Sequence, residues 1–316
     1  MTISVIIPTY KRPDELGKCL KALAGQERKA DEIIVVARQR DNETLAYLRE
    51  EARRSPVLKQ VIVTRPGQVA ALNAGLDEAK GDIISFTDDD CLPYPDWLKR
   101  IEAHFKADGR LGGVGGRDRV FIDGKEVAGS RCQVSGSRRR AGLITWYGRI
   151  IGNSHLGTGE AREADHLKGA NMSFRKEALE GIRFDERLRG EGAQYRNDLA
   201  LCLAVKKKGR KIIYDPRILV DHFYAARLEK DKRGNFDLTA IENAAFNETL
   251  IALKYMGLPR MLACLFYSFF IGDLFMPGIV QFARIILTGG KNPVSRFLFA
   301  LNGRLQAFKL NLKPNT

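Results

Sequence analysis

Cysteine is scarce in this chain, and its spacing excludes the structures that cysteine usually builds. None of the cysteines stands in a C-x-x-C pair, and their number is odd. Such a scattered set argues against a disulfide framework and against structural zinc, and it predicts a reducing, cytosolic setting. The five cysteines are Cys19, Cys91, Cys132, Cys202 and Cys264.

Long hydrophobic runs are also missing. The N-terminus has no basic stretch before its short apolar segment, which we interpret as a buried strand and not as a signal peptide. The longest apolar run, Met261–Gly272, is interrupted only by Ser268. At about 1.5 Å per residue, this run is too short to cross a hydrocarbon core of about 30 Å.

Positive charge is what the chain has in excess. Its 316 residues include 52 lysines and arginines against 38 acids, which gives a formal net charge of +14. Such a balance favours anionic partners, namely nucleotides, nucleic acid or an acidic membrane surface. Hydrophobic residues make up 44% of the chain, so it can bury the core of one large α/β domain or two ordinary ones.

The first hundred residues alternate short apolar runs with amphipathic segments. This alternation is typical of an α/β fold with a doubly wound, mostly parallel sheet and helices on both faces. Further on, we expect a hairpin within 114–127 that turns at Asp123-Gly124, and a solvated loop at Arg138-Arg139-Arg140. The expected strands are 4–8, 32–37, 61–63, 82–87, 211–214 and 218–221, and the expected helices are 14–24, 42–54, 68–79 and 197–208.

Three consecutive aspartates, Asp88, Asp89 and Asp90, end the apolar run 82–87. Adjacent carboxylates repel one another, and a divalent cation such as Mg²⁺ compensates them because it prefers oxygen ligands and shares them with phosphates. The carboxyl end of a strand is also where open α/β sheets bind ligands. A solvated turn is the alternative, but one acid suits a turn better than three. We therefore predict a metal site.

Two loops add groups that suit a nucleotide. After the first strand, Tyr10 offers a stacking face and Lys11 and Arg12 offer cations, just before a helix N-terminus. An ordinary strand-to-helix loop with a surface basic pair explains them equally well. Arg65 precedes the next small-residue helix and Asn73 lies one turn inside it. Tight helix–sheet packing explains the small residues of that helix, but it explains Asn73 less well.

Taken in order, these motifs resemble family 2 of the glycosyltransferases. The resemblance implies a GT-A-type fold and an inverting transfer of sugar from a nucleotide sugar with Mg²⁺ or Mn²⁺. It covers residues 1–225, in which 1–110 would be the nucleotide-binding half and 111–225 the acceptor-binding half. Residues 226–316 would be a helical, membrane-associating appendage. The segments that carry the resemblance are 4–12, 73–75, 88–90, 169–175 and 197–199.

The resemblance also implies residue roles. Asp198 would be the general base, although a first-turn acid favoured by the helix dipole is the alternative. Asp90 would ligate the metal, and His222 would be a metal or diphosphate contact or simply a half-buried histidine. Asp88 would contact the ribose or uracil. The expected nucleotide contacts are Thr9, Tyr10, Arg12, Asp41, Arg65, Asn73, Asp88 and Asp89, and the expected donor or acceptor contacts are Gly169, Ala170, Asn171 and Glu191.

Two positions depart from the family pattern. Asn197 precedes Asp198 where the family usually has Glu, so Glu191 stays as a reserve base and a non-catalytic nucleotide-sugar-binding protein stays open. After the second strand the family often has an acid that reads uracil, whereas this chain has the run Ala37-Arg38-Gln39-Arg40-Asp41; Asp41 would serve if the loop folds back, and UDP is the favoured nucleotide. A nucleotidyltransferase would also use carboxylates that bind a metal ion, but the order of motifs argues against this activity.

Two absent motifs narrow the function further. Neither Trp97 nor Trp146 belongs to the Gln-x-x-Arg-Trp motif of processive relatives, which predicts transfer of a single sugar. Gly113 and Gly115 begin a dinucleotide-binding spacing, but Asp118 occupies its last position. No nucleic-acid partner is expected.

The C-terminal apolar segments have basic residues on both sides, which predicts that both ends lie on the cytoplasmic face of a membrane. We expect an in-plane or re-entrant helical pair within 261–287, associated peripherally with that face, with buried core helices as the alternative. A glycan or lipid-linked acceptor and a role in polysaccharide biosynthesis fit this expectation. The flanking basic residues are Lys254, Arg260, Arg284, Lys291, Arg296, Arg304 and Lys309.

Overall fold

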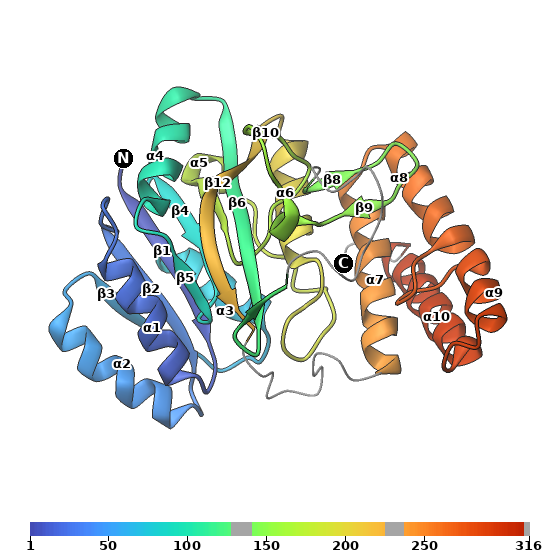
Figure 1. Ribbon diagram of the computed structural model, residues 1–316, viewed down its shortest axis with the longest axis horizontal. Coiled ribbons are helices and arrows are strands. Elements are labelled where there is room, and N and C mark those ends of the chain that lie inside the picture. The colour runs from blue at the N-terminus through green and yellow to red at the C-terminus, as the bar shows by residue number, and fades with distance from the viewer. Residues whose placement is uncertain (128–140, 225–236, 313–316) are drawn as a thin grey trace.

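The computed structural model describes residues 1–127, 141–224 and 237–312, so Cys132 and the predicted loop at 138–140 lie outside the described residues. Strands and helices alternate through the first half of the chain, and helices alone form the C-terminal part (Figure 1). The first helices are α1 (Pro13–Ala24), α2 (Asn42–Arg54), α3 (Gln68–Glu78), α4 (Trp97–Ala107), α5 (Lys176–Leu179) and α6 (Asn197–Lys207).

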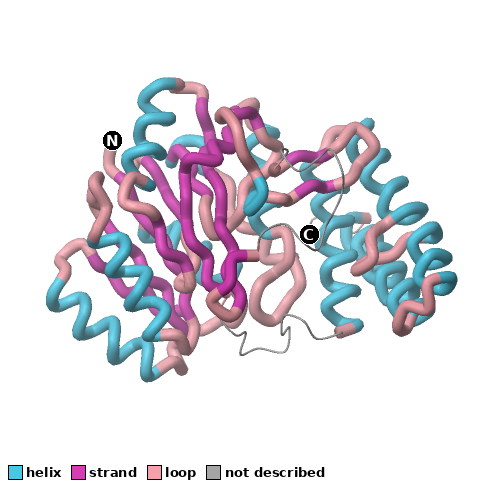
Figure 2. Tube along the Cα trace, viewed as in Figure 1, coloured by secondary structure: helices cyan, strands magenta, loops and turns pink. Residues whose placement is uncertain are grey.

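One mixed sheet forms the centre of the molecule (Figure 2). Its strands run in the order β10-β12-β6-β11-β4-β1-β2-β3, and β11 is antiparallel to both of its neighbours. The pairs of β1 with β2 and β4, of β2 with β3, and of β12 with β6 are parallel. These strands are β1 (Ile3–Thr9), β2 (Glu32–Arg38), β3 (Leu58–Val63), β4 (Ile83–Phe86), β6 (Leu111–Ile122), β10 (Arg162–Glu163), β11 (Met172–Arg175) and β12 (Lys211–Phe223).

Strand β1 shows why a continuous apolar run becomes the middle of this sheet. Successive side chains of a strand point to opposite faces. Ile6 packs on one face with α3 and α6, while Val5 and Ile7 pack on the other with α1, α2 and α4. Since helices cover both faces, every aliphatic side chain of the strand from Ile3 to Ile7 is buried. This confirms the predicted doubly wound, mostly parallel α/β fold.

The predicted hairpin is confirmed. Strand β6 pairs with β7 (Lys125–Glu126), and the turn residues Asp123 and Gly124 have φ values of 50° and 73°. Both values are positive, as the favoured two-residue hairpin turn requires. The two strands predicted at 211–214 and 218–221 are joined into the single strand β12, whose register shifts between Asp215 and Leu219.

The C-terminal part consists of α7 (Leu238–Tyr255), α8 (Leu258–Phe266), a π-helical turn (Tyr267–Ile271), α9 (Ile279–Leu287) and α10 (Pro293–Asn311). Helix α10 packs so closely on α7 that a Cβ atom added at Gly303 would lie 2.2 Å from the Glu242 carbonyl oxygen. In the described residues, no helix has both the length and the apolar character needed to cross a membrane.

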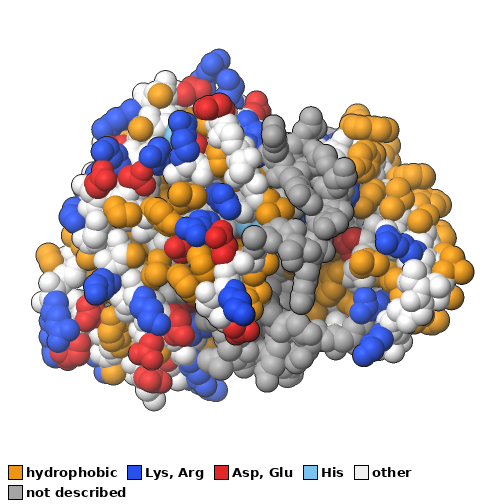
Figure 3. Space-filling model, in the orientation of Figure 1, with side chains coloured by type: hydrophobic (Ala, Val, Ile, Leu, Met, Phe, Trp, Pro, Cys, Tyr) orange, Lys and Arg blue, Asp and Glu red, His pale blue; other side chains and the backbone are white. Residues whose placement is uncertain are grey.

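Many apolar side chains of this C-terminal part stay exposed, and Figure 3 shows hydrophobic side chains gathered over its helices. We call this set the C-terminal apolar surface. The other side of the same helices is a packed core that includes Phe246, Leu250 and Ala300. The exposed members are Leu258, Leu262, Phe266, Phe270, Leu274, Phe275, Ile279, Val280, Ile286, Leu287, Val294 and Leu298.

Candidate active site

A cleft of about 1120 Å³ lies at the carboxyl ends of the parallel strands. At one end it is lined by residues at the carboxyl ends of β1, β2 and β3, and at the other by Thr239 and Asn243 of α7 and by Phe275. Asp88, Asp198 and His222 line its middle. This edge of an open α/β sheet is where ligands generally bind.

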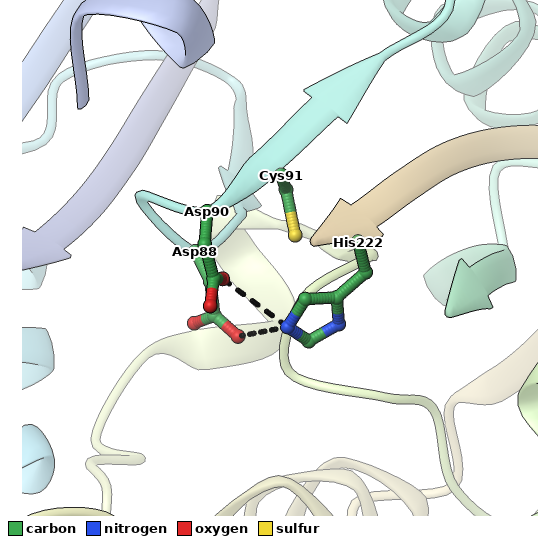
Figure 4. Close-up of side chains that lie close together, drawn as sticks. All are labelled: Asp88, Asp90, Cys91 and His222. Atoms are coloured by element: carbon green, nitrogen blue, oxygen red, sulfur yellow. Dashed lines mark ion pairs between the residues drawn. The ribbon is translucent and has the colours of Figure 1, made fainter. Parts of the chain in front are cut away.

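The aspartate turn lies where β4 ends and leads into the short strand β5 (Cys91–Pro93). Strand β5 pairs with the end of β12 so that Cys91 lies opposite His222. The His222 Nε2 atom is therefore 3.1 Å from Asp90 Oδ1 and 3.9 Å from Asp88 Oδ2 (Figure 4). The Nδ1 atom lies 3.7 Å from an oxygen of Asp118.

Four side chains could hold a metal ion here. The ligand atoms of Asp88, Asp90, Cys91 and His222 all lie within 4.8 Å of one another. His222 is 1% exposed, and among the described residues neither of its ring nitrogens makes an aligned hydrogen bond. A buried polar atom without such a bond is costly, and a metal ion at Nε2 would satisfy it. The residues present thus fit a divalent cation.

The protonation of the cluster follows from burial and charge. Burial alone would lower the pKa of His222, but the Asp118 and Asp90 carboxylates raise it to about 9, so a metal ion that binds Nε2 must displace a proton. Burial, together with Asp90 and Asp88, raises the pKa of the Cys91 thiol well above its ordinary value. Carboxylate oxygens and imidazole nitrogen suit Mg²⁺ or Mn²⁺ better than a neutral thiol does.

Asp89 has a different task from its neighbours. The residue is 3% exposed. Its carboxylate accepts a hydrogen bond from Thr9 Oγ1 at 2.8 Å and lies 3.0 Å from Arg12 Nη1. Burial raises the pKa of Asp89 to about 7 even though Arg12 opposes the shift. Both oxygens are used inside the protein, so Asp89 ties the loop after β1 to the aspartate turn.

Asp198 stands in the first turn of α6, after Arg196 in a left-handed conformation with φ of 68°. Its Oδ2 accepts from the Gly169 N–H at 3.2 Å and its Oδ1 from the Leu199 N–H at 2.8 Å. These two bonds fix the carboxylate at the wall of the cleft. An acid held there can accept a proton from a hydroxyl group that enters the cleft.

Lys168, which is not among the predicted site residues, also lines the cleft next to Gly169. Burial would lower the pKa of its ammonium group, but the Asp198 and Asp118 carboxylates raise it. Arg38 likewise lines the cleft, with Cζ 4.2 Å from the centre of the Tyr10 ring. The only signal for Lys168 was its place directly before the Gly169-Ala170-Asn171 motif, and for Arg38 its place at a strand end.

Most of the predicted site residues come together in this one cleft. The predicted residues that line it are Thr9, Tyr10, Arg12, Arg65, Asp88, Asp89, Asp90, Gly169, Ala170, Glu191, Asp198 and His222.

Three predicted contacts, Asp41, Asn73 and Asn171, lie outside the cleft lining. Asp41 caps α2 by accepting from the Thr44 N–H and also accepts from the Lys11 N–H. Asn73 bonds to both the N–H and the carbonyl of Phe184, each at 3.0 Å.

Asn171 is the third of these residues and is fully buried. It accepts from Trp97 Nε1 and donates to the Ile218 carbonyl, both at 2.9 Å. All three side chains satisfy buried polar groups of the protein, and their contact with a ligand stays a prediction.

Comparison with known proteins identifies the family. The model of glycosyl transferase family 2 matches residues 4–182, more than half of the chain. The chain belongs to this family. It is 33% identical over 101 residues to glycosyltransferase AglE of Haloferax volcanii, covering 31% of this chain and 33% of the relative. It is 30% identical over 106 residues to an undecaprenyl-phosphate 4-deoxy-4-formamido-L-arabinose transferase of Pseudomonas fluorescens, covering 32% and 31%. The matches thus span about a third of the length of these curated relatives.

Solved structures share the fold. A mannosyltransferase from Pyrobaculum calidifontis in complex with GDP-Man and Mn²⁺ has a TM-score of 0.58 and 19% identity, and the match covers 99% of this chain and 88% of that one. S. aureus TarS 1-349 in complex with UDP-GlcNAc has a TM-score of 0.66 and 17% identity, with 97% and 81% covered. The GT-A-type fold predicted for this family 2 chain is therefore confirmed.

Proposed function

We propose that this family 2 chain transfers a single sugar from a nucleotide sugar, UDP-linked, to a hydroxyl group of a glycan or lipid-linked acceptor. The observation that carries the proposal is that Asp198 and the Asp90–His222 pair line one cleft from different elements. Asp198 can accept a proton, while the cluster that contains Asp90 and His222 binds a metal ion and, with it, a diphosphate.

Asp88, Asp90 and His222 would hold Mg²⁺ or Mn²⁺, which would neutralise the charge that develops on the leaving diphosphate. Arg12 lies between Asp89 and Asp90, 3.7 Å from the latter, and adds a fixed positive charge at the same place. Together with the metal ion, Arg12 would face the leaving anion.

Asp198 would act as the general base. The Gly169 and Leu199 N–H groups orient its carboxylate, and an acceptor hydroxyl within hydrogen-bond reach would lose its proton to it. A single base with in-line attack gives inversion at the anomeric carbon. Glu191, which is exposed at the wall of the cleft, is the reserve candidate for the same role.

The acceptor would enter from the C-terminal end of the cleft, where α7 and Phe275 form part of the lining. We propose residues 1–225 as the catalytic domain and 226–316 as a region that contributes to the acceptor site and associates with a membrane. The C-terminal apolar surface and the basic residues around it suit the interface of an anionic bilayer. Peripheral association with the cytoplasmic face fits this arrangement, and the named undecaprenyl-phosphate relative supports a lipid-linked acceptor.

The test begins with a thermal-shift screen of nucleotide sugars, with and without Mn²⁺, to find the donor. Release of the nucleoside diphosphate from that donor is then measured. We expect Mn²⁺-dependent release that Asp90→Ala abolishes. Binding of a nucleotide sugar without any turnover would favour a non-catalytic binding protein, and release of pyrophosphate from a nucleoside triphosphate would favour a nucleotidyltransferase.

A further inference from the structure

We call the part of the cleft at the carboxyl ends of β1, β2 and β3 its nucleotide end. If the diphosphate binds at Asp90 and Arg12 and the sugar lies toward Asp198, the base must extend to the opposite side. On that side the lining consists of Tyr10, Arg38, Val63 and Arg65. This inference rests on the proposed function, because it takes the diphosphate position from it.

Arg38 is the charged residue best placed to meet the base. It ends β2, where the parallel pairing sets it beside Val63 of β3. Its guanidinium lies over the Tyr10 ring, with Cζ 4.2 Å from the ring centre. A guanidinium held on an aromatic ring is pre-organised to donate hydrogen bonds.

The two carboxylates closest in position to this end of the cleft, Asp41 and Glu186, are engaged in other contacts. Asp41 is turned into the cap of α2 and lies outside the cleft lining. Glu186 lines the cleft, but Arg65 Nη1 lies 2.8 Å from one of its oxygens and Asn73 Nδ2 3.4 Å from the other. Among the described lining residues contributed by the ends of β1–β3, the charged side chains are Arg12, Arg38 and Arg65.

Arginine has N–H donors and no acceptor. Uracil O4 and guanine O6 accept hydrogen bonds, whereas cytosine and adenine present an amino group at the equivalent position. We propose that Arg38 is a specificity-determining residue that selects donors with a keto base, such as uracil or guanine, against donors with an amino base. Arg38 thereby takes the place of the acid that the family often uses. It would donate a hydrogen bond to the oxygen of the base, whereas an acid accepts one from the N–H of the base.

The experiment is calorimetry of the full chain with nucleoside diphosphates in excess Mn²⁺. UDP against CDP, and inosine diphosphate against ADP, are matched pairs that exchange a keto oxygen for an amino group with little change in shape. We expect the keto member of each pair to bind at least about tenfold more tightly. In Arg38→Ala the Kd values for the two members of each pair should differ by no more than about threefold. Arg38→Gln, whose amide both donates and accepts, should also narrow the preference.

Arg40→Ala is the matched control, because Arg40 is exposed on the same loop and outside the cleft lining. It removes one positive charge and should leave both ratios unchanged. An equal loss of affinity for both members of a pair in Arg38→Ala would overturn the proposal, because it would show a general anion contact. A wild-type chain that binds both members of each pair equally would also overturn it. If no nucleoside diphosphate binds the wild-type chain, the proposed function fails together with this inference.

Discussion

His222 Nε2 lies 3.1 Å from Asp90 Oδ1, although the two residues lie far apart in the sequence. The pairing of β5 with β12 sets this distance, because Cys91 and His222 are direct partners in the register. The metal site is therefore built by tertiary structure and not by the aspartate turn alone. Its properties should respond to changes on either strand.

Asp90→Asn should weaken Mn²⁺ binding at least about tenfold, because it removes a charged oxygen ligand beside His222. Titration of Mn²⁺ followed by electron paramagnetic resonance measures this directly. Asp123→Asn is the matched control, since it removes one acid from the tip of the β6–β7 hairpin, where Asn tolerates the positive φ. Equal Mn²⁺ affinity in Asp90→Asn and Asp123→Asn would contradict the assignment.

Asp89→Ala should destabilise the fold by about 3–5 kcal/mol, because it leaves Arg12 partly buried without its closest carboxylate and Thr9 without an acceptor. Urea unfolding of the two proteins measures the difference. Glu50→Ala offers a comparison at an exposed ion pair with Arg53, where the loss should be smaller. A loss of under about 1 kcal/mol in Asp89→Ala would remove the proposed structural role of Asp89.

Acid should loosen the contact between the C-terminal helices and the catalytic half. Burial opposes ionisation of Asp165 and Asp185, yet hydrogen bonds and cations lower the pKa of both carboxyls. A carboxyl whose folded pKa is depressed stabilises the fold above its unfolded pKa of about 3.9, and this stabilisation is lost as the pH falls through the folded value. Asp165 binds Arg260 of α8, and Asp185 binds Lys254 of α7.

We therefore expect the melting temperature to hold from pH 7 to about pH 5 and to fall below about pH 4. Asp185→Asn should melt lower at pH 7 and show a weaker dependence on acid, because the titrating group is gone. A melting temperature of Asp185→Asn that falls with acid as steeply as that of the wild-type chain would assign the acid sensitivity to other groups.

Membrane binding should depend on the C-terminal apolar surface. Phe266 and Leu287 are 60% and 86% exposed there. The double variant Phe266→Glu, Leu287→Glu should bind vesicles of phosphatidylglycerol and phosphatidylcholine at least about tenfold more weakly, because it removes apolar area and adds repulsion. Ile62→Glu is the control, since Ile62 is 52% exposed on β3 in the catalytic half. Co-sedimentation unaffected by the double variant would contradict membrane association through this surface.

The fold could be predicted because its signals are local. Buried strands such as Ile3–Thr9 are continuous apolar runs, and the Asp123-Gly124 turn has a sequence that strongly favours a hairpin. The aspartate triplet could be predicted as a site because three acids after a buried strand are unfavourable without a cation. The position of His222 beside that triplet depends on a long-range strand pairing, so the sequence left its surroundings open.

The two asparagines among the predicted contacts show a different limit. Asn73 and Asn171 stand inside motifs shared with the family, and the sequence does not tell whether a buried amide bonds to a ligand or to the backbone. Here both bond to the protein. Arg38 and Lys168 were missed because a single basic residue carries little signal in a chain with a net charge of +14. Only the tertiary structure shows that they line the cleft.

Hydrolysis of the donor sugar nucleotide by Asp198→Asn, at saturating Mn²⁺, tests the central claim most directly. Asparagine keeps the shape of the side chain but cannot accept the proton, so we predict that kcat falls about 100- to 10,000-fold while the Kd for the nucleoside diphosphate stays within about threefold. Glu191→Gln, measured in parallel, should keep kcat within about threefold. A normal kcat in Asp198→Asn would contradict the account.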